Sequence, residues 1–176
     1  MPNLLGNFQL ENISTAISTL RILNIGIKDS HIKNGIGKLS SLARLQEIKK
    51  GKLKKLVKNN RLIVDGSHNE NGSQALNEYL KSLNCKKHIL IGMMANKQHE
   101  KYISYFKNIS SLTTVDIPNQ PNAISGKDLK EKFKNLNNVK YQPSIKHAIK
   151  SISLGKGDIL LITGSLYLAS EVLSLN

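Results

Sequence analysis

The chain has 176 residues and a hydrophobic fraction of 39%, enough for one domain, or one domain plus part of another, with a buried core. Its net charge of +14 suggests a polyanion partner, but only three of its 26 basic residues are arginine, and its one basic cluster, residues 49–55, lacks interleaved aromatics. We therefore expect no nucleic-acid partner, and with neither an apolar run of about 20 residues nor a secretion signal we expect no membrane partner and a cytoplasmic location.

Two helices are predicted at the start of the chain. Between residues 9 and 24 apolar side chains recur every three or four positions, which is the pattern of an amphipathic helix. A second helix is expected over residues 29–39, with Asp29 or Ser30 as its cap. Two helices bury little surface alone, so we interpret residues 1–40 as the end of another domain.

The remaining residues, 41–176, alternate between strand-like and helix-like segments. The basic cluster at 49–55 is expected to be a solvated loop or hairpin, with a phosphate-binding patch as the alternative. Short β-rich apolar runs then occur in RLIVDG, KHILIGMM, LTTVDI and GDILLITG, and segments with helical spacing separate them. This alternation indicates βαβ units, and the all-apolar strand centres predict helices on both faces. The expected fold is α/β, with a Rossmann-like, mostly parallel sheet preceded by two helices.

The turn DGSHN follows the first of these strands and precedes a helix. Ligands of open parallel sheets bind beyond the carboxyl ends of the strands, so Asp65 and His68 are candidate site residues. A structural alternative stays open, because Ser67 and Glu70 match a capping box and Asn69 is a second suitable cap. The motifs GxxxxGK[ST], GxGxxG, HExxH and CxxC do not occur. The residues alone therefore indicate only a nucleotide-sized ligand above a parallel sheet.

Five motifs resemble those of the folylpolyglutamate synthases, including the bifunctional dihydrofolate synthases, in the Mur ligase superfamily. LIVDGSHNENGSQALNEYL is similar to the family's DGAHNP strand, turn and helix, and LLGNFQLENISTAISTLRIL to its GxxQxxNxxxA helix. LARLQEI resembles its GRL[QE] strand, IGMMANKQHEKYISYF its GxxxDK turn, and LLITGSLYLASEVL its terminal TGSLYL segment. The resemblance implies that residues 1–40 are the last helices of the central ATP-binding domain and that residues 41–176 are the C-terminal, glutamate ligase domain.

The resemblance implies a reaction in folate biosynthesis that joins L-glutamate to a folate or to dihydropteroate. In the family, ATP phosphorylates a carboxylate, and the amino group of glutamate displaces phosphate from the acyl phosphate. The family's phosphate-binding loop and Mg²⁺ carboxylates match no segment of this chain, so we expect no metal ligands here and no activity of the chain alone. A separate N-terminal ligase portion is the implied partner, and a non-catalytic nucleotide-binding or degenerate module of the same fold is the alternative.

Three residues match positions that contact ATP in the family: Asn12, Arg44 and Asp65. The Asn12 amide suits adenine, and the forked guanidinium of Arg44 suits phosphate. Asp65 is able to accept hydrogen bonds from a ribose hydroxyl or to organise Arg44. One departure lies next to the arginine, where Ala43 stands in place of a glycine that would allow a close approach to phosphate.

Two further residues, His68 and Ser165, match positions that the family uses for glutamate handling or at the reaction centre. Ser165 is equally suited to cap the last helix. Lys97 matches the lysine of the GxxxDK turn, where Asn96 replaces the family's acid, and its role stays open.

Overall fold

The computed structural model describes residues 5–39 and 41–176, and its centre is a six-stranded sheet. The strands are β1 (Gln46–Glu47), β2 (Arg61–Val64), β3 (Lys87–Ile91), β4 (Ser111–Val115), β5 (Val139–Gln142) and β6 (Ile159–Thr163). They lie in the order β1-β2-β6-β3-β4-β5, and every neighbouring pair is parallel except β1 with β2. The prediction of a mostly parallel α/β sheet is confirmed.

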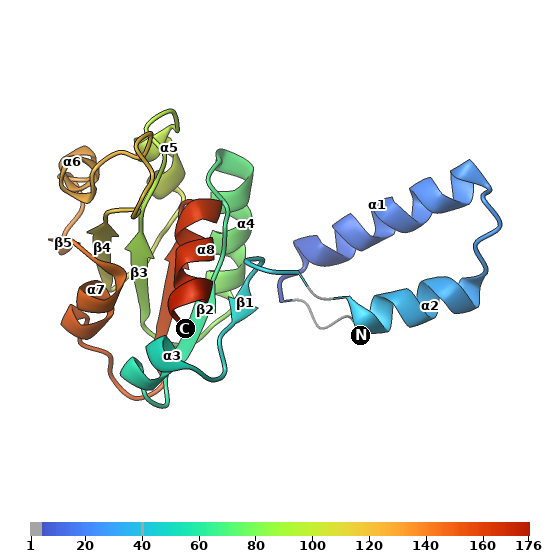
Figure 1. Ribbon diagram of the computed structural model, residues 1–176, viewed down its shortest axis with the longest axis horizontal. Helices are drawn as coiled ribbons and strands as arrows, with labels where there is room; N and C mark the ends of the chain where they lie inside the picture. Colours follow the sequence, from blue (N-terminus) through green and yellow to red (C-terminus); the bar gives the residue numbers. More distant parts are fainter. Residues whose placement is uncertain (1–4, 40) are drawn as a thin grey trace.

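Helices cover both faces of this sheet (Figure 1). The helices are α1 (Phe8–Leu23), α2 (Asp29–Lys38), α3 (Lys52–Leu56), α4 (Glu70–Lys81), α5 (His99–Ser104), α6 (Gly126–Lys132), α7 (Ile145–Ser151) and α8 (Leu166–Leu175). On one face Leu160 and Ile162 share a core with α3, α7 and α8, and on the other Leu161 shares a core with α4, α5 and α6. Successive strand residues point to opposite faces, so an all-apolar run contributes to both cores. None of the described helices is long and apolar enough to cross a membrane.

Two elements of the α/β domain differ from the expectation. The basic cluster at 49–55, expected as a loop or hairpin, enters the short helix α3, because Leu53 and the following Val57 are buried and Lys54 Nζ donates to the Asn60 carbonyl at 2.8 Å. The edge strand β5 was not expected from the sequence, because VKYQ carries no apolar run. In the structure it is only partly buried. Both elements owe their structure to the neighbours on which they pack.

Helices α1 and α2 form a hairpin that projects away from the α/β domain (Figure 1). Gln9 is the only buried residue of the two helices. Apolar side chains of both helices line a groove of about 500 Å³ between them, and Ile22 at the far end is 83% exposed. The expected caps of the second helix are wrong: Asp29 and Ser30 lie inside α2, and Lys28 occupies the cap position without a side-chain hydrogen bond.

The exposed hairpin leads to a prediction about local stability. We expect fast amide hydrogen exchange in α1 and slow exchange in β3 and β6, because few buried contacts oppose local opening of the hairpin. Exchange measured by mass spectrometry on the intact chain tests this, with the sheet-packed helix α4 as the matched helical control. Protection of α1 equal to that of α4 would contradict the prediction, and protection that grows with protein concentration would indicate self-association.

Candidate functional site

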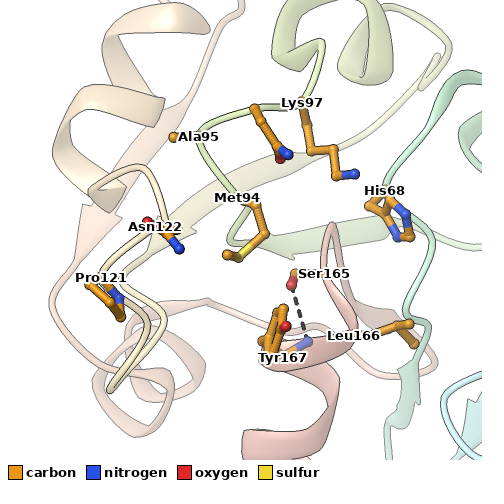
Figure 2. A pocket seen from close by; sticks show the side chains of 10 residues that line it. His68, Met94, Ala95, Lys97, Pro121, Asn122, Ser165, Leu166 and Tyr167 are labelled. Atoms are coloured by element: carbon orange, nitrogen blue, oxygen red, sulfur yellow. Dashed lines mark hydrogen bonds between the residues drawn. The ribbon is translucent and has the colours of Figure 1, made fainter.

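Two cavities open at the edge of the sheet where the parallel strands end. The turn cavity, about 570 Å³, is lined by the turns that follow β2, β3, β4 and β6, as Figure 2 shows. The junction cavity, about 960 Å³, lies between the start of α1, the segment around Arg44, the β2 turn and α4. His68 lines both cavities. The structure thus brings Asn12, Arg44, Asp65 and His68 together around one space, and His68, Lys97 and Ser165 around the other.

Asp65, directly after β2, is 2% exposed and fixes two pieces of backbone. Its Oδ2 accepts a hydrogen bond from the Leu45 N–H at 2.7 Å, and its Oδ1 accepts one from the Ser67 N–H at 2.8 Å. Burial raises the pKa of this carboxyl, while these N–H groups and the charge of Arg44 act in the opposite direction. Each oxygen already has a backbone partner, so the geometry matches the organising role considered for Asp65 better than a ribose contact.

The segment that Asp65 holds has an unusual backbone on both sides of Arg44. Ala43 has a φ of 53° and Leu45 a φ of 46°, both in the left-handed region. This region disfavours non-glycine residues by about 1–2 kcal/mol each, and such conformations persist when surrounding contacts hold them. Here Gly66 N–H donates to the Ala43 carbonyl at 2.8 Å, and Ala43 N–H donates to Gln46 Oε1 at 2.9 Å. The turn therefore forms without the glycine expected there, and Arg44 lies exposed at the wall of the junction cavity.

Asn12 reaches the junction cavity from α1, together with a residue that the sequence did not single out. Its Nδ2 donates to Gln9 Oε1 at 3.3 Å. Gln9 is 6% exposed, and its Nε2 finds no acceptor among the residues that the structure describes. A buried donor without a partner is unfavourable by about 1–3 kcal/mol. Its position one helical turn before Asn12 in the FQLEN motif is the signal that would have identified it.

His68 has a defined tautomer in this structure. Its Nδ1 lies 3.0 Å from the Gly66 carbonyl oxygen. A carbonyl only accepts, so Nδ1 carries a proton and the neutral ring keeps a lone pair on Nε2. Figure 2 shows the Lys97 side chain extending toward His68 from the turn after β3. The pair therefore provides a proton acceptor and a cation at the wall of the turn cavity.

Ser165 is both a wall of the turn cavity and the cap of α8. Its Oγ accepts a hydrogen bond from the Tyr167 N–H at 3.1 Å, drawn as the dashed line in Figure 2. The capping alternative stated for Ser165 is thus confirmed, while its part in glutamate handling stays a prediction.

We expect Ser165→Ala to lower the free energy of unfolding by about 1 kcal/mol, the usual effect of losing a serine cap. Ser144→Ala removes the cap of α7 and is the matched control, because Ser144 lies outside both cavities. Urea unfolding measures both, and a Ser165→Ala effect below about 0.3 kcal/mol would contradict the capping role.

The start of α4 settles the choice between the two proposed caps. Asn69 Oδ1 accepts a hydrogen bond from the Gly72 N–H at 2.9 Å, so Asn69 is the cap. The capping box of Ser67 with Glu70 is wrong: Glu70 pairs with Lys101 at 2.6 Å instead. The Ser67 hydroxyl is thereby left for another partner.

That partner is the buried hydroxyl of Tyr102, on α5. It lies 3.0 Å from Ser67 Oγ and 2.8 Å from Thr163 Oγ1, and it is able to donate to the Ser67 carbonyl at 3.2 Å. Burial raises the pKa of Tyr102 well above its ordinary value, so the phenol stays protonated. One hydroxyl therefore ties α5 to the β2 turn and to the end of β6, close to His68 and Ser165.

We expect Tyr102→Phe to lower the free energy of unfolding by about 1–3 kcal/mol, because it leaves the Ser67 and Thr163 hydroxyls without this partner. Tyr167→Phe is the matched control, since that ring is 52% exposed. Chemical denaturation compares the two variants, and equal small losses would show that the hydroxyl contacts contribute little.

No group of three or more His, Cys, Asp or Glu side chains comes close enough to hold a metal ion anywhere in residues 5–39 and 41–176. Mg²⁺ prefers oxygen ligands, usually carboxylates together with substrate phosphates and water. The described residues therefore form no all-protein cluster of ligands for Mg²⁺. Gln9 and Asn12 bring amide groups to the junction cavity and Arg44 brings a guanidinium, and Gln9 Nε2 has no acceptor among the described residues. Groups of these kinds suit a nucleotide ligand.

Residues 44–166 match the family of Mur ligase glutamate ligase domains. Over 178 residues the chain is 26% identical to the dihydrofolate synthase/folylpolyglutamate synthase of Bacillus subtilis, covering 97% of this chain and 39% of that protein. It is also 26% identical over 176 residues to the folylpolyglutamate synthase of Lacticaseibacillus casei, covering 96% of this chain and 38% of that protein. The chain thus spans less than half the length of these curated relatives.

Solved structures show the same fold. The folylpolyglutamate synthase of Thermotoga maritima superimposes with a TM-score of 0.76 at 23% identity, over 100% of this chain and 41% of that one. The Mycobacterium tuberculosis enzyme, complexed with ADP and AMPPCP, superimposes with a TM-score of 0.83 at 16% identity, over 99% of this chain and 41% of that one.

Proposed function

Because the chain belongs to the Mur ligase family, with a glutamate ligase domain over residues 44–166, we propose that it supplies this domain to an ATP-dependent ligase that adds L-glutamate to a folate or to dihydropteroate. The observation that carries the proposal is the junction cavity, which is lined by Asn12, Arg44 and the turn of Asp65 and His68, three separate parts of the sequence. The names of both curated relatives support the substrate class, and the ADP and AMPPCP of the Mycobacterium tuberculosis structure support a nucleotide.

In this proposal the junction cavity receives ATP. Asn12, with Gln9 behind it, offers amide groups that suit the edge of adenine. Arg44 contributes a guanidinium for phosphate, and Asp65 acts through the backbone that positions Arg44. ATP supplies the phosphoryl group that activates the carboxylate of the folate or dihydropteroate acceptor as an acyl phosphate.

L-Glutamate is assigned to the adjoining turn cavity. The Lys97 ammonium and the amino end of the ten-residue helix α8, capped by Ser165, favour the carboxylates of glutamate. Nε2 of His68 is free to take the proton that the amine loses as its nitrogen bonds to the acyl carbon and phosphate leaves.

We assign the triphosphate loop and Mg²⁺ to the ligase portion that the relatives carry outside the matched region, in the same or a separate polypeptide. In the proposal, residues 1–40 are the last helices of the ATP-binding domain and belong with that portion. The chain alone is then expected to be inactive, because phosphoryl transfer depends on positioning and charge neutralisation by those groups.

A chimeric ligase tests the function directly. In it, this chain replaces the matching part of the Bacillus subtilis relative, and ATP-dependent glutamylation of dihydropteroate and of tetrahydrofolate is followed by mass spectrometry. Product formation that is lost in the His68→Ala chimera is the expected result. A folded chimera that binds ATP without forming product would favour the non-catalytic nucleotide-binding module, and one that binds neither ATP nor glutamate would refute both readings.

A further inference from the structure

The opposite edge of the sheet, where the strands begin, holds a second cluster of reactive side chains. His88 and Ser111 are paired residues at the starts of β3 and β4, and Asp158 immediately precedes β6. His88 Nδ1 lies 2.8 Å from Ser111 Oγ, and His88 Nε2 lies 3.2 Å from Asp158 Oδ2. His88 and Asp158 are each 6% exposed, so the contact between them is shielded from water, while Ser111 is only partly buried. None of these residues belongs to the site proposed for the ligase.

The partners fix the direction of the hydrogen bonds. Asp158 Oδ2 also accepts a hydrogen bond from the Gly155 N–H at 2.6 Å, as an ionised carboxylate does. A carboxylate only accepts, so His88 Nε2 carries a proton, and in the neutral form of the ring Nδ1 has a lone pair that can accept the Ser111 O–H. These are the roles of nucleophile, base and orienting acid in serine-dependent acyl transfer, with the imidazole turned so that Nδ1 faces the serine.

Ser111 and His88 also line a cavity of about 200 Å³. At about 30 Å³ per water molecule, this space holds a group of only a few heavy atoms, such as a short acyl chain. Lys140 and Asn138 stand in the same wall. Cations and amide donors are the groups that stabilise the oxyanion that develops during acyl transfer.

We propose that Ser111 is an activated nucleophile that accepts the acyl group of a small activated ester. Ser111 Oγ bonds to the carbonyl carbon while its proton passes to His88 Nδ1. The ester C–O bond then breaks, and the leaving alkoxide takes the proton from His88. Water, deprotonated by His88 in the same way, releases the acid and restores the serine. The activity is independent of glutamate ligation, because no residue is shared.

Acetylation of the intact chain by p-nitrophenyl acetate tests the proposal, with the modified residues located by peptide mass spectrometry. Ser110 lines the same cavity without a hydrogen bond to His88 among the described contacts, so it is the internal control. We expect Ser111 to be acetylated about 10²-fold faster than Ser110, the usual contribution of a general base. Asp158→Asn should reduce the Ser111 rate at least tenfold, while Ser110→Ala leaves it unchanged.

Equal rates of acetylation of Ser110 and Ser111 in the wild-type chain would overturn the proposal, and this comparison does not require a variant to fold. Ser111→Ala provides the second readout, since it should abolish the fast phase of p-nitrophenolate release. A fast phase that survives Ser111→Ala in a folded chain would assign the reaction to another residue and equally overturn the proposal.

Discussion

Asp65→Ala is expected to lower the free energy of unfolding by about 3 kcal/mol, because it leaves the buried N–H groups of Leu45 and Ser67 without an acceptor, at about 1–3 kcal/mol each. Asp116→Ala is the matched control. Asp116 also accepts two hydrogen bonds, from Gly126 N–H and the Tyr141 hydroxyl, both at 2.6 Å, but it is only partly buried. Water is able to replace that carboxylate, so its loss should be smaller. Urea unfolding at neutral pH measures both, and equal losses would contradict the importance of burial at Asp65.

The same carboxyl gives a pH dependence of known sign. Burial raises the pKa of Asp65 in the folded chain above the ordinary value of 3.8, so the folded state holds its proton to a higher pH than the unfolded state does. The contribution of this group to stability is therefore complete below the ordinary carboxyl range and is lost as the pH rises through the raised pKa. The stability difference between the wild-type chain and Asp65→Asn should accordingly fall with rising pH across that window. A stability difference that rises with pH would contradict a raised pKa of Asp65 in the folded chain.

Arg44→Ala in the chimeric ligase is expected to lower kcat/KM for ATP by about 10²–10³-fold, the usual effect of removing one group that stabilises charge at a reaction centre. The kcat/KM of the Arg44→Lys chimera should lie between those of the unsubstituted chimera and Arg44→Ala, because lysine keeps the positive charge but lacks the forked N–H donors of arginine. Stability should hardly change, since the Arg44 side chain is exposed. Arg21→Ala is the matched control, because Arg21 lies on the exposed face of α1 and pairs only with the exposed Asp29 among the described residues. Steady-state kinetics measures both variants. A kcat/KM for ATP of Arg44→Ala within twofold of that of Arg21→Ala would refute the role of Arg44 in phosphate binding.

The centres of β2, β3 and β6 were predictable because each reads as a continuous apolar run, which is typical of a strand buried on both faces. ILLIT is the clearest case, since all five residues of β6 are buried. Helix α3 and strand β5 were missed for the opposite reason. In α3 Leu53 and Leu56 pack against the core among three lysines, which leaves no apolar run in the sequence. In β5 a parallel neighbour on one side holds a mixed sequence at the sheet edge.

The site was predictable as far as chain order determines it. Asp65 and His68 follow a strand directly, so their place at the carboxyl end of β2 follows from the pattern alone. The contacts that hold this turn in place do not follow from the pattern, because they join residues far apart in the sequence. Asp65 contacts Leu45 across 20 positions, and Tyr102 contacts Thr163 across 61. Those contacts depend on how helices pack on the sheet, which local spacing does not encode.

The junction cavity has walls on two parts of the molecule, Asn12 on the projecting hairpin and Arg44 with His68 on the α/β domain. A ligand that contacts both walls also fixes the position of the hairpin relative to the α/β domain. The conformational entropy lost when the hairpin is fixed lowers the affinity of that ligand. By thermodynamic linkage this coupling is reciprocal. A contact that fixes the hairpin in its ligand-bound position raises the affinity for the ligand by the same factor by which the ligand favours that position. A cross-link between α1 and α4 that preserves the cavity should thus tighten nucleotide binding without adding a contact to the nucleotide.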